Sequence, residues 1–278
     1  MKAIALIVLL WPAVASGEPE LSLRLSSWGS LSAGQGAPFD GLIGQIHVAP
    51  GVELGERAIF LSLFAGATTK VSSLSEQYWN NAVEPRLTGG ARFALPLGAL
   101  IREAWANLFL GGRYERFVYF TGAQVLDRRV AAFTELMFGL DWRCAGGSRR
   151  CTGRGAPLFA RCELAIQSDG TGRGVQLTGY VQQAVDVARL AGGAVAPTVT
   201  VQLKQNDRAN EYWNDVLELA AGIRWRAQAT PLPSLYGSLT VELRGESRVY
   251  LPSVRPAEHR VLVLVGFGLF GRLAGVTL

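Results

Sequence analysis

Apolar and polar residues alternate along most of this chain of 278 residues, most clearly over residues 213–226. The apolar positions there are Leu217, Leu219, Ala221, Ile223 and Trp225. Successive side chains of a β-strand point to opposite faces, so a period of two predicts a strand with one apolar and one polar face. The pattern recurs as far as the segment 259–270, and the chain is predicted to be all-β.

Twelve segments carry this pattern, and an even number of strands is typical of a single-chain barrel of the bacterial outer membrane. They are centred near residues 20–28, 42–49, 57–68, 86–96, 103–116, 129–142, 157–167, 175–187, 194–205, 213–226, 235–246 and 259–270. The sequence therefore predicts a transmembrane antiparallel β-barrel. With both chain ends in the periplasm, we expect segments 69–85, 117–128 and 206–212 outside, and turns 98–102 and 188–193 on the periplasmic side.

A soluble β-sandwich also alternates, so the nature of each face has to be argued. Trp213 and Trp225 share the apolar face, and at ~3.3 Å per residue and ~40° tilt they lie roughly 30 Å apart, close to the spacing of two membrane aromatic girdles. The polar face carries full charges, such as Glu218 and Arg224. Charged residues make up only 18% of the chain, whereas a soluble domain has about a quarter. These features favour the membrane barrel, with a soluble sandwich as the alternative.

The N-terminus has the features of a secretory signal peptide. Lys2 precedes an apolar run over residues 3–11 and then small residues up to Gly17. The run is too short for a transmembrane helix. We expect a signal peptide at residues 1–17 and the outer-membrane barrel at 18–278.

Three cysteines permit at most one internal disulfide. Cys144 and Cys151 flank a Gly- and Arg-rich segment, and a disulfide between them is favoured, with Cys144–Cys162 across a hairpin as the alternative. This segment would be a long periplasmic turn. No C-x-x-C motif or nearby histidine is present, so neither a metal site nor a cofactor is expected.

A duplication is visible within the chain. The triplet Tyr78-Trp79-Asn80 recurs as Tyr212-Trp213-Asn214, and a lysine precedes each copy by eight residues. Further on, residues 113–119 (RYERFVY) resemble residues 244–250 (RGESRVY). The offsets are 134 and then 131, so the barrel is predicted to consist of two six-strand repeats.

Charged residues on the polar faces would point into the lumen. Those predicted to line it are Arg92, Arg113, Glu135, Lys204, Glu218, Arg224, Arg226, Glu242 and Arg244, with Glu115, Asp141 and Glu246 beside them. Two interpretations remain open. The charges could form ion pairs that stiffen a narrow lumen, or a polar track for an anionic or sugar-rich solute.

Aromatic residues near the strand ends predict a membrane girdle. The candidates are Tyr78, Trp79, Trp142, Tyr212, Trp213 and Trp225. A carbohydrate-stacking platform at the barrel mouth is the alternative for the two Tyr-Trp-Asn copies.

No arrangement in the sequence predicts catalysis. The chain has two histidines, His47 and His259, and neither has a serine at a spacing that would place both on one face with a third, orienting group. The chain is therefore predicted not to be an enzyme. An exported chain is not expected to bind nucleic acid, although arginines cluster at residues 143–154.

The motifs Tyr212-Trp213-Asn214 and Gly222-Ile223-Arg224-Trp225, together with the segment 241–260, resemble the C-terminal barrel of a phage N4 adsorption protein A-like family. More loosely, they resemble outer-membrane barrels of exopolysaccharide secretion systems. The resemblance covers about 180 residues, since segment 90–142 has the same layout. It implies a channel or export-route component for polysaccharide or another polar solute, surrounded by outer-membrane lipid. Members of the family carry a helical-repeat periplasmic domain, so here a separate periplasmic partner would couple the barrel to export. A structural or adhesive barrel with a plugged lumen is the alternative, and a lipid-modifying barrel enzyme is a more remote one.

Overall fold

The computed structural model describes residues 19–35, 41–56, 58–73, 81–95, 104–120, 128–141, 157–169, 172–207, 215–232, 235–251 and 256–277. Twelve long strands account for most of them: β1 (Glu20–Gln35), β2 (Gly41–Glu56), β3 (Ile59–Ser72), β4 (Ala82–Leu95), β5 (Ala104–Arg116), β7 (Arg128–Asp141), β8 (Pro157–Asp169), β9 (Gly172–Ala184), β11 (Gly193–Asn206), β12 (Val216–Leu232), β13 (Leu235–Tyr250) and β14 (Glu258–Thr277). Two short strands, β6 (Val118–Tyr119) and β10 (Ala188–Leu190), pair with β4 and β11. In the described ranges no helix has the length and apolar character needed to cross a membrane.

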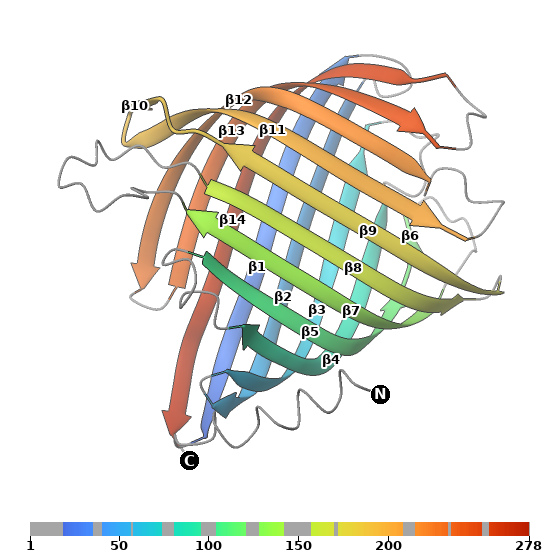
Figure 1. Ribbon diagram of the computed structural model, residues 1–278, viewed down its shortest axis with the longest axis vertical. Helices are drawn as coiled ribbons and strands as arrows, with labels where there is room; N and C mark the ends of the chain where they lie inside the picture. Colours follow the sequence, from blue (N-terminus) through green and yellow to red (C-terminus); the bar gives the residue numbers. More distant parts are fainter. Residues whose placement is uncertain are drawn as a thin grey trace.

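The sheet closes on itself as an antiparallel barrel. Each long strand pairs with the next long strand along the chain, and β9 pairs with β11 past the short β10. The first and last strands complete the ring, from Glu20 opposite Thr277 to Gln35 opposite Val261. Figure 1 shows the blue β1 beside the red β14. The predicted fold, a barrel of twelve long strands, is confirmed.

Each predicted segment overlaps one long strand, and β2 shows one of the larger differences. Pro50-Gly51 has the composition of a turn, yet the strand continues through it to Glu56. Pro50 keeps its place opposite Leu25, although proline cannot donate to the ladder. Gly51 is required because a Cβ there would come within 2.2 Å of the Phe64 ring. The strand continues past an aromatic ring through residues that lie between two predicted segments.

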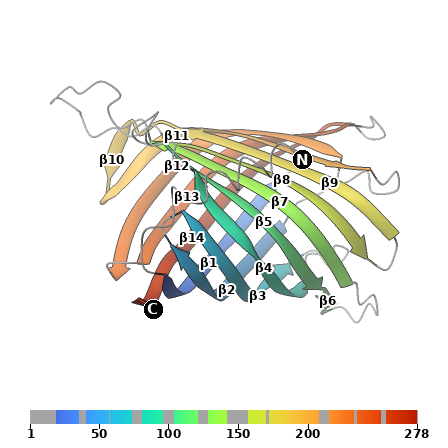
Figure 2. The same cartoon turned by 60° about the horizontal axis from the view of Figure 1, so that its bottom comes forward.

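The outer surface of the barrel is apolar. Ile223, Leu243 and Val261 expose 61%, 55% and 57% of their surface, and apolar residues are similarly exposed on the other long strands. Figure 2 shows the tilted strands surrounding one interior, so these side chains cover the outside of the ring. A soluble protein rarely exposes so large an apolar surface. A closed antiparallel barrel with an apolar exterior and a polar interior is the architecture of the bacterial outer membrane. The chain is an outer-membrane β-barrel.

The strand register repeats between the two halves of the barrel. Lys70 pairs with Ala82 across β3 and β4, and 134 positions later Lys204 pairs with Val216 across β11 and β12. Glu115 pairs with Arg129 across β5 and β7, and 131 positions later Glu246 pairs with Arg260 across β13 and β14. The duplication predicted from the short motifs is therefore confirmed in the hydrogen-bond ladder.

The repeat extends to the strands where the sequence showed no motif. His47 of β2 pairs with Trp28 and Thr68, and 133 positions later Tyr180 of β9 pairs with Arg161. Thr68 corresponds to Gln202, which is the other partner of Tyr180. The same holds at the two junctions between the halves. Trp28 pairs with Gly268 where β1 meets β14, and Arg161 pairs with Met137 where β8 meets β7. Gly268 is the equivalent of Met137 at the offset of 131. The barrel thus has an approximate twofold axis along its lumen.

Candidate functional site

The nine residues predicted to line the lumen all lie on the inward face of their strands. Alternation fixes this orientation, because the residues on either side of each belong to the opposite face of the strand, the face that carries the exposed apolar side chains. Glu115 and Glu246 also point inward, whereas the side chain of Asp141 lies outside the described part of the chain. The candidate site is therefore the charged inner wall, and its clusters are described below from the residues that form them.

In the first half, a buried carboxylate on β2 holds two arginines together. Glu53 accepts hydrogen bonds from Arg24 at 2.6 Å, from Arg92 at 3.1 and 3.2 Å, and from the Ser62 hydroxyl at 3.0 Å. The guanidinium of Arg92 also lies 4.3 Å from the centre of the Phe60 ring. We call these residues the Glu53 cluster. Glu53 was missed in the sequence because it lies between the predicted segments 42–49 and 57–68, although it alternates with Val52 and Leu54.

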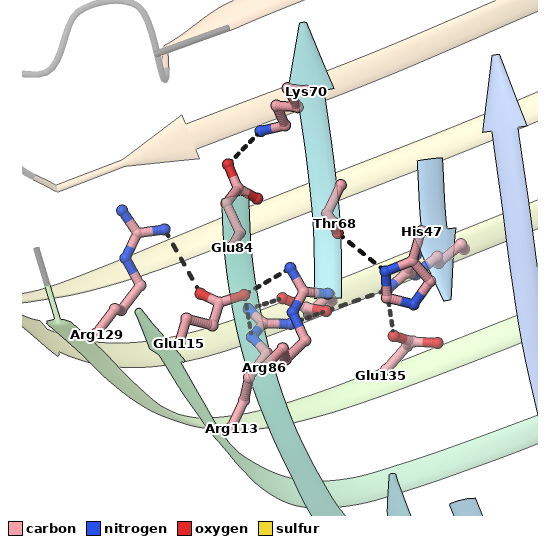
Figure 3. Close-up of polar contacts among 11 residues, drawn as sticks. His47, Thr68, Lys70, Glu84, Arg86, Arg113, Glu115, Arg129 and Glu135 are labelled. Atoms are coloured by element: carbon pink, nitrogen blue, oxygen red, sulfur yellow. Dashed lines mark hydrogen bonds and ion pairs between the residues drawn. The ribbon is translucent and has the colours of Figure 1, made fainter. Parts of the chain in front are cut away.

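A second network crosses β4, β5, β7 and β8 (Figure 3). Arg113 donates to both oxygens of Glu163, two strands away, at 3.0 and 3.2 Å. Arg161 reaches Glu135 at 2.5 Å and Glu163 at 3.3 Å. The contact of Arg113 with Glu163 passes over β7, so these two residues could not be matched from sequence spacing.

In the second half, Arg224 occupies the centre of the wall. It donates to Glu242 at 2.5 and 2.7 Å and to the amide oxygen of Gln182 at 2.8 Å. The Thr198 hydroxyl also donates to Glu242, at 3.1 Å. We call these residues the Glu242 cluster, and in it every side chain belongs to a different strand.

The twofold relation extends to part of the charge pattern. Glu115 forms ion pairs with Arg113 at 3.3 Å and with Arg129 at 3.9 Å. The equivalent Glu246 pairs with Arg244 at 2.8 Å and with Arg260. Nearby, Lys70 pairs with Glu84 at 2.6 Å, and their equivalents are Lys204 and Glu218, the latter in an ion pair with Arg248. The same outer-side charges therefore line both halves.

The basic side chains lie closer to the open lumen than the acidic ones. Arg161 exposes 47% of its side chain and its partner Glu135 only 10%. For Arg86 and Glu115 the values are 33% and 5%. The basic side chain is also the more exposed one in the other ion pairs of the described residues. The exception is the pair of Arg113 and Glu163, whose side chains are equally exposed. A solute in the lumen would thus meet guanidinium groups first, with the carboxylates behind them.

His47 points into the same interior. Its ring stacks on Trp28 with 5.5 Å between centroids, and its Nδ1 lies 2.9 Å from the Thr68 hydroxyl. Trp28, His47 and Thr68 belong to β1, β2 and β3, so these contacts join three neighbouring strands.

A cavity of about 100 Å³ opens in the inner wall of the second half. It is lined by Phe159, Gln182, Ala184, Asp186, Ala196, Arg224 and Arg226. Arg226 lies 4.0 Å from Asp186 and exposes 27% of its side chain. Phe159 is tilted against Tyr180 at 6.0 Å and against Trp105 at 6.2 Å, between ring centroids.

The other predicted residues are only partly described. Trp225 faces outward, and its indole N–H donates to the carbonyl of Leu190 at 2.7 Å. Five predicted girdle residues lie outside the described part: Tyr78, Trp79, Trp142, Tyr212 and Trp213. The same holds for Cys144 and Cys151, so the favoured disulfide stays a prediction. Cys162 is a free, exposed thiol on β8.

The structure also bears on the chemistry of the histidines. The register places His259 directly opposite Ser247 on the outward face, a pairing that the sequence spacing had hidden. Within the described ranges, no group of three or more His, Cys, Asp or Glu side chains is arranged to hold a metal ion.

Comparisons with known proteins give similarities of overall shape only. No protein-family model and no curated protein matches the chain. The β domain of the Bordetella autotransporter BrkA is similar at a TM-score of 0.45 and 13% identity, over 89% of this chain and 98% of that one. The KdgM porin in complex with oligogalacturonate has a TM-score of 0.37 and 9% identity, over 87% and 98%.

A bacterial polysaccharide outer-membrane secretin is similar at a TM-score of 0.35 and 11% identity, over 91% of this chain and 99% of that one. None of the three is a phage N4 adsorption protein A-like protein. The resemblance predicted from the sequence thus holds at the level of outer-membrane barrels, and the function has to be argued from the lumen itself.

Proposed function

We propose that the barrel is a passage across the outer membrane for polar solutes that carry negative charge, with polysaccharide fragments as the class expected from the sequence. The observation that supports this is the order of charges in the wall. Arg161, Arg86 and Arg226 expose 47%, 33% and 27% of their side chains, whereas their acidic partners expose 5–14%.

Electrostatics makes this order selective. Two unit charges 4 Å apart interact by about 1 kcal/mol in bulk water and about 4 kcal/mol at the effective dielectric constant near a protein surface. A permeating anion approaches the guanidinium groups at the shorter distance, and the buried carboxylates only partly cancel the attraction. Rings of charged side chains set selectivity in this way in other pores.

Ion selectivity in planar lipid bilayers tests the proposal. The purified barrel should give discrete conductance steps and a reversal potential on the anion-selective side in a salt gradient. The charge reversals Arg161→Glu and Arg226→Glu should shift the reversal potential toward cations. Arg173 lies on the outward face near the outer end of β9, so Arg173→Glu makes the same change of charge outside the lumen and serves as the control. Unchanged selectivity in both lumen variants would refute the proposal.

A second candidate function is a structural or receptor barrel with a closed lumen. The ion-pair network of Figure 3 favours it, because its arginines and carboxylates are held by one another. Such a barrel would show no conductance steps in wild type. Its partner-binding activity would then depend on the outer segments, and deletion of residues 74–80 should abolish it without changing the barrel's folding.

We further propose that a channel that exports polymer works with a separate periplasmic protein that delivers the chain, and that the barrel itself is not an enzyme. Co-purification from cross-linked cells tests the first point. If a periplasmic protein is cross-linked equally in a strain that makes no polymer, it is not a delivery partner.

A further inference from the structure

The residues around the cavity beside Arg226 have twofold equivalents in the first half, and three of these form a packed cluster. There Arg92 is held by Glu53 at 3.1 Å and covered by the Phe60 ring. At the equivalent positions the second half has Arg226, Asp186 and Ala194. The shorter aspartate reaches its arginine only at 4.0 Å, and the alanine has no ring to cover it. The second half thus has an open space where the first half has a packed cluster.

The same cavity has gained groups that the first half lacks. Arg224 stands at the position equivalent to Gly90, and Glu242, which holds it, stands at the position of Gly111. Likewise, Phe159 stands at the position equivalent to Ser26, and Gln182 at the position equivalent to Ala49. The cavity therefore combines a loosely held guanidinium, a second guanidinium fixed by Glu242 and Gln182, a carboxylate and an aromatic ring. The residues that line the cavity come from β8, β9, β11 and β12, which are neighbours in the sheet, and Asp186 lies just after the end of β9 (Figure 1).

We infer that this cavity is a binding subsite for a carboxylate-bearing sugar unit of the anionic solute. This inference rests on the proposed function and names its substrate class. A guanidinium presents two parallel N–H donors that match a carboxylate, and Arg226 has the room to offer them. The face of the Phe159 ring is electron-rich and suits the C–H groups of a sugar ring. Asp186 can accept a hydrogen bond from a sugar hydroxyl.

The size of the cavity fits one end of such a unit. Water occupies about 30 Å³ per molecule in the liquid, so about 100 Å³ corresponds to roughly three waters. A carboxylate and the adjoining edge of its ring fill that space, and the rest of the solute stays in the lumen. The site therefore holds one unit of a chain without enclosing it.

Ligand-observed NMR titration of the purified barrel in detergent tests the inference without requiring conductance. The probe is D-glucuronate, with D-glucose as the neutral match and inorganic phosphate as a second anion. We expect saturable binding of glucuronate, and at least tenfold weaker binding of the other two. Equal affinity for glucose would refute the role of the carboxylate, and equal affinity for phosphate would refute the sugar class.

Three variants locate the site, each first checked for folding by heat-modifiable gel mobility. Arg226→Gln should raise the Kd about tenfold, because a hydrogen bond to a charged group is lost. Ala194→Phe supplies the ring that Phe60 provides in the first half, and should remove saturable binding while leaving every charge in place. Arg92→Gln makes the same change of charge at the twofold-equivalent position, and should raise the Kd less than threefold.

Wild-type affinity in a folded Ala194→Phe barrel, or equal effects of Arg226→Gln and Arg92→Gln, would overturn the subsite. The proposed function and the subsite can be refuted separately. A barrel that binds glucuronate through Arg226 but gives no conductance would refute the passage and leave the subsite. An anion-selective pore without saturable glucuronate binding would refute the subsite alone.

Discussion

Replacing Glu53 by glutamine tests how strongly the buried carboxylates hold the wall together. Glu53 exposes 5% of its side chain and accepts hydrogen bonds from Arg24, Arg92 and Ser62. Glutamine keeps the size of the side chain but removes the negative charge and replaces one acceptor oxygen by a donor. Two guanidiniums then remain beside each other without a counter-charge.

The expected cost follows from the exposure of these groups. Breaking a fully buried ion pair destabilises a protein by about 3–5 kcal/mol. The guanidinium side chains of Arg24 and Arg92 expose 31% and 19%, so lumen water solvates part of their charge. We therefore expect Glu53→Gln to lower the free energy of unfolding by about 2–3 kcal/mol. The control is Asp186→Asn at the twofold-equivalent position, which has a single 4.0 Å contact and should cost less than about 1 kcal/mol.

Equilibrium urea unfolding of the barrel in phospholipid vesicles, followed by tryptophan fluorescence, measures both values. A double-mutant cycle with Arg92→Gln isolates the pair, and its coupling energy should exceed about 1 kcal/mol. A loss below about 0.5 kcal/mol for Glu53→Gln, or an equal loss for Asp186→Asn, would contradict this reasoning. Equal losses would mean that the two halves hold their arginines in the same way.

Three further predictions concern the lumen, the wall and the histidines. Raising the salt from 0.1 to 1 M shortens the screening length from about 10 to 3 Å, so the anion selectivity measured by reversal potential should decrease; constant selectivity would exclude exposed guanidiniums as its source. Gly51→Ala places a Cβ 2.2 Å from the Phe64 ring and should lower stability in urea, whereas Gly245→Ala meets nothing within 4 Å and should not; equal effects would show that Gly51 is not needed for close approach. Hydrolysis of phospholipid or lipid A should be at background in wild type, and activity lost in His259→Ala or His47→Ala would show the barrel to be an enzyme.

The alternation of the sequence was enough to predict the barrel and the inward side of Arg92, Arg224 and Glu242. A period of two assigns each residue to a face, and a slip by one residue would move every side chain to the other face. The pattern failed at Pro50-Gly51, because the packing of Phe64 on a glycine is a contact between strands and has no local signal. It likewise could not identify partners such as Glu53 and Arg92, whose contact passes over β3.

The cavity could have been predicted in part. Once the offset of 134 is known, the sequence alone aligns Ala194 with Phe60 and Arg226 with Arg92. What the alignment cannot supply is the distance from Asp186 to Arg226 or the volume left by the missing ring. Both depend on how the strands tilt and on where long side chains settle, which only the three-dimensional structure provides.

The duplication explains why an asymmetric site can exist in a symmetric wall. Register has to be preserved after duplication, because any slip would expose the charged face to lipid, and the paired registers of β3–β4 and β11–β12 show that it was. The inward side chains can be substituted more freely after duplication, because their polar groups need only a hydrogen-bond partner, which can be another side chain or water. In the first half this freedom produced a packed clamp around Arg92, and in the second an open space beside Arg226. A solute on the barrel axis would meet the equivalent outer-side charges of Glu115 and Glu246 equally from both halves. Contact with the cavity draws such a solute to one side, so binding there is off the axis and comes from the second repeat.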